Sequence, residues 1–121
     1  MKGMKEMKDY KFEFEVEGVR YPLIFNLNVM ETIQEEYGSL KKWGDLTDGK
    51  TGEVNVKALK FGLAEMMNEA IDIENEENGT NRPLFTTKQV GRLITRIGIE
   101  KATEKLNNAI VEGVKSEEKN A

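Results

Sequence analysis

The feature that most constrains the fold of this chain is a change of hydrophobic period near Phe25. From Tyr10 to Phe25 the apolar side chains recur at every second residue, and Glu17-Gly18 interrupts the alternation. A period of two places alternate side chains on one face of a strand, and a short turn containing glycine joins antiparallel strands. The segment therefore predicts a β-hairpin. Its second strand should lie at an edge near Pro22, because proline cannot donate to a ladder.

After Phe25 the apolar residues recur at three- and four-residue steps, which is the helical period. Helix starts are predicted at Asn26 or Asn28, at Asn55 and at Thr86, where Gln89 completes a capping box. We expect an α+β fold in which the N-terminal β-hairpin packs on a bundle of three main helices and one short helix, the short one beginning at Ser39.

One domain is expected over residues 10–115, since 121 residues are enough for a single core. Residues 1–9 are predicted to be a disordered arm, and the charged residues 116–121 a disordered tail. The acidic, Asn- and Gly-containing stretch from Asp72 to Arg82 shows no period, so it predicts a mobile surface loop.

The sequence contains no cysteine and no histidine. Disulfides, thiolate nucleophiles and Cys-ligated zinc are thereby excluded, as are the usual general base near neutral pH and the commonest metal ligand. No residue is assigned to a catalytic, cofactor-binding or metal-binding role, and no cofactor is expected. The chain is expected not to be an enzyme.

The formal net charge is -4, so a phosphate backbone would be repelled by the average surface. We therefore expect no nucleic-acid partner. The sequence has no apolar run near the roughly 20 residues that span a bilayer, and no apolar segment follows the N-terminal lysines. The prediction is a cytoplasmic protein without an export signal or a membrane partner.

The segment Gly44-Asp45-Leu46-Thr47-Asp48-Gly49-Lys50-Thr51 has the spelling of a phosphate-binding P-loop. Such a loop needs a buried strand before it and a helix that starts at its Lys-Thr pair. Here an amphipathic turn precedes it, and Gly52-Glu53 interrupts any helix from Lys50. A polar surface loop is the favoured interpretation, and P-loop-like nucleotide binding is a remote alternative.

Three further motifs have ordinary explanations. The acidic run between Asp72 and Glu77 lacks EF-hand spacing, so a solvated loop is favoured. Asn78-Gly79-Thr80 spells a glycosylation acceptor, which a cytoplasmic chain does not use. The segment 90–106 is compatible with a helix-turn-helix, but its second helix mixes glutamates with lysines, which does not suit a DNA groove.

Partner-binding residues are not fixed by the sequence. Trp43, Met66 and Met67 are the candidates, because tryptophan anchors interfaces and methionine adapts to varied partners. Core packing is the favoured alternative for all three.

The hairpin that runs into FNLNVMETIQEEYGSLKKW (Phe25 to Trp43), a later helix, and LFTTKQVGRLI (Leu84 to Ile94) together resemble the tail assembly chaperones of long-tailed bacteriophages and prophages. The resemblance extends from Tyr10 to about Val114. The segment from Asp72 to Arg82 does not align with it.

The resemblance implies a chaperone that binds the phage tape-measure protein, helps to recruit tail-tube protein and is absent from the mature virion. It also implies the cytoplasm of a bacterial host, with self-association as a further expectation. The alternative is a structural tail or head-tail component that stays in the virion.

Overall fold

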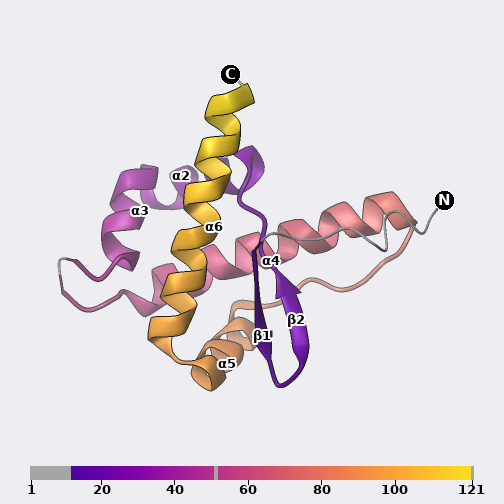
Figure 1. Cartoon of the computed structure of the whole chain (residues 1–121), viewed down its shortest axis with the longest axis horizontal. Coiled ribbons are helices and arrows are strands. Elements are labelled where there is room, and N and C mark those ends of the chain that lie inside the picture. Colours follow the sequence, from indigo (N-terminus) through magenta and orange to yellow (C-terminus); the bar gives the residue numbers. More distant parts are fainter. Residues whose placement is uncertain (1–11, 51, 121) are drawn as a thin grey trace.

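A computed structural model describes residues 12–50 and 52–120 of the chain. In chain order the elements are β1 (Glu13–Val16), β2 (Val19–Pro22), α2 (Leu27–Tyr37), α3 (Leu40–Thr47), α4 (Val56–Asn78), α5 (Thr87–Ile97) and α6 (Ile99–Asn120). The two strands form one antiparallel hairpin. In the view of Figure 1, α6 crosses α4, the hairpin lies to one side of α6 and α3 to the other, and α2 passes behind α6 toward α3.

The hairpin has the turn that its sequence predicts. Val16 pairs with Val19, so Glu17 and Gly18 are the two loop residues. Both have positive φ, 51° and 86°, which matches the twist of the flanking strands. Phe14 and Tyr21 pair across the strands and stack with their ring centroids 5.4 Å apart.

Side-chain caps begin four of the helices. Asn26, Ser39, Asn55 and Thr86 each accept a hydrogen bond from a backbone N–H in the first turn. The capping box of Thr86 with Gln89 is present, with Gln89 Oε1 accepting from the Thr86 N–H at 2.8 Å. These caps set the directions in which the helices leave the loops.

The core lies between the hairpin and the helices, with side chains from both and with α4 contributing more of them than any other element. Its largest fully buried side chains include Phe14, Trp43, Ile33, Leu63 and Leu106. Gly62 allows a close approach here, because a Cβ at this position would collide with the Trp43 ring. The hairpin is thus stabilised by packing on helices, as a lone two-stranded hairpin requires.

The α+β class and the hairpin packed on a helical bundle are confirmed. Within the described residues the bundle holds four longer helices besides the short α3, rather than three. Gly98, with φ 95°, separates α5 from α6, so the two apolar segments on either side of it form distinct helices.

The predicted loop from Asp72 to Arg82 is wrong as far as Asn78. Helix α4 continues to Asn78 and ends at Gly79, which takes the left-handed conformation with φ 66° and donates to the Asn75 carbonyl. A glycine at this position is a common helix stop. Only the residues after Gly79 form the connection to α5.

The predicted arm at residues 1–9 lies outside the described residues. At the other end, α6 is assigned as far as Asn120, so the backbone is helical over most of the segment 116–121 that was predicted to be disordered.

Candidate protein-binding surface

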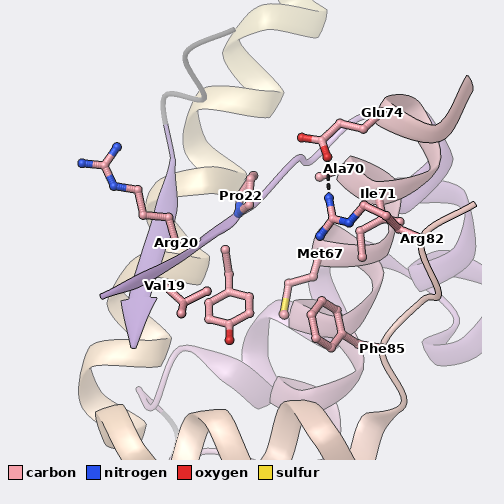
Figure 2. A pocket seen from close by; sticks show the side chains of 10 residues that line it. Val19, Arg20, Pro22, Met67, Ala70, Ile71, Glu74, Arg82 and Phe85 are labelled. Carbon is pink, nitrogen blue, oxygen red and sulfur yellow. Dashed lines mark hydrogen bonds and ion pairs between the residues drawn. The ribbon is translucent and has the colours of Figure 1, made fainter. Parts of the chain in front are cut away.

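Two shallow clefts adjoin each other on the side of the hairpin that faces α4 and α5. The first, of about 70 Å³, lies between β2, α4 and the connection to α5, as Figure 2 shows. The second, of about 190 Å³, lies between β2 and α5. Both are smaller than the roughly 300–1,000 Å³ of typical small-molecule sites. Their shape suits contact with a macromolecule better than enclosure of a metabolite.

Tyr21 and Phe85 line both clefts and join them. Their rings meet edge to face, with centroids 5.8 Å apart and an interplanar angle of 67°. Both side chains are only partly buried. Met67 lines the first cleft and Leu93 the second, so each cleft has a buried apolar side chain in its lining.

Asn68 fixes the position of Phe85. Its side-chain amide donates to the Phe85 carbonyl at 3.0 Å and accepts from the Phe85 N–H at 2.8 Å. Asn75, two turns further along α4, makes the same pair of contacts with Arg82, both at 3.0 Å. Two asparagines therefore hold the extended connection along α4, which replaces the mobile loop that the sequence predicted.

The clefts are bordered by arginines. Arg82 lines the first, and Arg92 and Arg96 line the second. Arg20 also borders the first cleft, but its guanidinium points away from the other lining side chains (Figure 2) and pairs with Glu13. These are the four arginines of the whole sequence, whereas its other basic residues are lysines. We call Tyr21 and Phe85 together with Arg82, Arg92 and Arg96 the arginine–aromatic surface.

Three of the arginines pair with glutamates of the chain. Arg82 Nη1 lies 2.6 Å from Glu74 Oε1, Arg20 Nε lies 3.5 Å from Glu13 Oε2, and Arg96 Nη1 lies 3.8 Å from Glu17 Oε1. The three arginine side chains are 56–69% exposed, so the pairs contribute little to folding stability. They do restrict where the guanidinium groups point.

Arg92 is exposed and forms no ion pair with another described residue. It lies on α5 at a helical step from Gln89 and Arg96, while Val90, Leu93 and Ile94 are the buried residues of that helix. The inner side of α5 thus packs on the core, and its arginines border the open cleft.

A third cleft lies on another part of the molecule, between the start of α4 and the junction of α5 with α6. Its volume is about 310 Å³, and it is mostly apolar, with Lys60 as its one charged lining residue among the described ones. It lacks the several convergent polar groups that orient a small ligand.

The P-loop-like segment does not form a phosphate site over its described residues. Gly44 to Thr47 belong to helix α3, and no strand leads into them. The Lys50 N–H donates to Asp48 Oδ1 at 2.9 Å, which makes a local turn at the place where the backbone amides would have to face a phosphate. Thr51 lies outside the described residues.

The three candidate contact residues are buried. Trp43 is 1% exposed and donates from Nε1 to the Ala58 carbonyl at 3.0 Å, and Met66 and Met67 are also in the core. They take the core role that was the alternative for each, and burial leaves them little surface to offer a partner. Met67 nevertheless lies beside Phe85 at the first cleft (Figure 2).

Among the described residues, no three acidic side chains are arranged to hold a metal ion. Burial raises the pKa of Glu65, and the nearby Glu69 and Asp72 raise it further.

Burial also raises the pKa of Tyr37, with a smaller effect from Glu36. The Tyr37 hydroxyl is buried without a hydrogen-bond partner in the described structure, and its ring packs against Phe61. Neither group faces the arginine–aromatic surface.

Sequence analysis missed the arginine–aromatic surface because its residues come from three separate parts of the chain. The available signal was the small number of arginines together with the step of four residues between Arg92 and Arg96. That spacing places two arginines on one side of a helix.

Comparison with known proteins gives no match: no family model, no curated protein and no solved structure resembles the chain at a significant level. Among the described residues, no helix is long and apolar enough to cross a membrane.

Proposed function

We propose that this chain is a tail assembly chaperone of a long-tailed phage or prophage. In this role it is not an enzyme: it binds the helical tape-measure protein in the host cytoplasm and aids assembly of the tail tube. The observation that supports binding of another protein by this chain is the arginine–aromatic surface. The resemblance of the segments Phe25 to Trp43 and Leu84 to Ile94 supports the more specific assignment.

The composition of the surface supports binding to a protein. Tyrosine and arginine are enriched at protein interfaces and are frequent among the residues that dominate binding energy. Here two partly buried rings lie among three arginines beside two clefts that also contain apolar lining residues. A long helical client exposes apolar stripes before it is packed, and such clefts can receive its side chains.

Solubility of the client tests the proposal. The chain would be co-expressed with the long helical protein encoded beside it, and each would also be expressed alone. We expect the helical protein to be soluble only in the presence of the chain and to co-purify with it. A helical protein that is equally soluble alone and never co-purifies would contradict the proposal. Recovery of the chain from purified virions would favour a structural tail component instead.

A further inference from the structure

We propose that the arginine–aromatic surface binds a segment of a partner protein in which carboxylates flank an apolar side chain. The inference rests on the proposed function, in that the chain acts by binding another protein. The inference adds the location of the binding site and the chemical character that the partner must have.

The apolar side chain of the partner is recognised by the two clefts. Tyr21 and Phe85 stand between them, and Met67 and Leu93 line one cleft each. Clefts of about 70 and 190 Å³ receive individual side chains rather than a whole ligand. The Asn68 contacts hold Phe85 in place before binding, which lowers the entropy cost of forming the complex.

The carboxylates are recognised by the guanidinium groups. A guanidinium carries five N–H donors, and a single carboxylate engages at most two of them in a bidentate pair. Arg82 and Arg96 therefore keep donors for a second carboxylate beside the glutamates that orient them. Arg92, which forms no ion pair with a described residue, is the most available of the three.

The charge of the chain makes this surface selective. The net charge is -4, so most of the molecule repels an acidic segment, while the clustered arginines attract it. Complementary charge of this kind fixes the place and orientation of a partner more than it adds affinity. Phosphates also bind arginine, but Glu74 and Glu17 pair with two of the three arginines, so the surface carries little net positive charge for the many phosphates of a nucleic acid. An isolated carboxylate needs only one available guanidinium, such as that of Arg92.

The test uses three labelled helical peptides and fluorescence anisotropy at low salt. The first has an apolar stripe flanked by glutamates, the second has lysine in place of each glutamate, and the third keeps the glutamates but has serine in the stripe. We expect the first to bind at least about tenfold more tightly than either of the others. Equal binding of the lysine peptide, or of the serine peptide, would overturn the proposal.

Charge reversal locates the binding site. The double variant Arg92→Glu/Arg96→Glu should weaken binding of the first peptide at least about tenfold. The matched control Lys57→Glu/Lys101→Glu makes the same change of charge at exposed positions outside both clefts, and should leave the affinity within about twofold. Thermal unfolding checks that both variants fold. Equal losses in the two variants would overturn the assignment of the surface.

Two other results would also overturn it. One is tighter binding of a single-stranded oligonucleotide than of the first peptide, with the difference lost in Arg92→Glu/Arg96→Glu. The other is a dimer of the chain that dissociates in the same variant, because the occupant would then be a second copy.

The same variants separate this proposal from the proposed function. If Arg92→Glu/Arg96→Glu binds the full-length helical client as the natural chain does, the surface is wrongly assigned and the chaperone role stands. If the natural chain binds the first peptide through these arginines but no helical client, the surface stands and the chaperone role fails.

Discussion

At the scale of single residues, Glu65 carries a carboxyl group that the fold favours in its neutral form. Burial raises its pKa, and the charges of Glu69 and Asp72 raise it further. Glu69 is itself held in place, because its Oε2 accepts from the side-chain amides of Asn26 and Asn28 at 2.8 and 3.1 Å. The folded chain therefore keeps a proton on Glu65 at pH values where the unfolded chain has released it.

The sign of the pH effect follows from this difference in proton binding. Where the folded state binds more protons, the free energy of unfolding falls as pH rises. Glu65 thus lowers stability above the ordinary pKa range of glutamate, and has no such effect below it.

We predict that Glu65→Gln raises the melting temperature at pH 7 and that the gain disappears near pH 4. The substitution removes the charge and keeps the shape of the side chain. Circular dichroism at the two pH values measures the effect, with Glu76→Gln, at an exposed position of the same helix, as the control for charge. A gain of equal size at both pH values, or a loss at pH 7, would contradict the account.

Residue type alone did not decide which large side chains were available to a partner. Trp43 and the two methionines fit either a core or an interface by chemistry, and their burial depends on how α3 and α4 pack. Gly62 shows the same dependence, because only the assembled fold brings the Trp43 ring over it.

At the scale of elements, the connection between α4 and α5 has the largest influence on the candidate site. Its backbone groups at Arg82 and Phe85 hydrogen-bond to asparagine side chains of α4 rather than to another strand. This arrangement brings an aromatic ring and an arginine to the edge of β2.

We predict that Asn68→Ala destabilises the chain by about 1–3 kcal/mol, because it leaves the Phe85 N–H and carbonyl without their partner. The same change should weaken binding of the glutamate-flanked peptide, since Phe85 loses its fixed position. Urea unfolding and the anisotropy assay measure the two effects. Asn108→Ala on exposed α6 surface should change neither by a comparable amount. A peptide affinity unaffected by Asn68→Ala would show that Phe85 needs no such support.

Local signals predicted the start of each element better than its end. The turn at Glu17-Gly18 and the cap at Thr86 depend on a few adjacent residues, and both are present in the structure. The end of α4 was missed because the residues from Asp72 to Asn78 are acids and amides with little apolar period. Its stop signal was Gly79, and the asparagine contacts that hold the next segment span up to 17 residues.

At the scale of the whole molecule, the sequence predicted the fold class but not the surface. Hydrophobic period specifies which faces are buried, so the hairpin, the bundle and their shared core could be inferred. The arginine–aromatic surface depends on the relative positions of β2, the connection after α4, and α5. No local pattern encodes those positions.

In the proposed role, the chain binds a helical protein through the arginine–aromatic surface. NMR spectra of the labelled chain, recorded as the helical client is added, test whether it does. We predict the largest shifts at Tyr21, Phe85 and Arg92, with little change at Lys41 on α3. Shifts confined to α2 and α3, or no shifts at all, would contradict the claim.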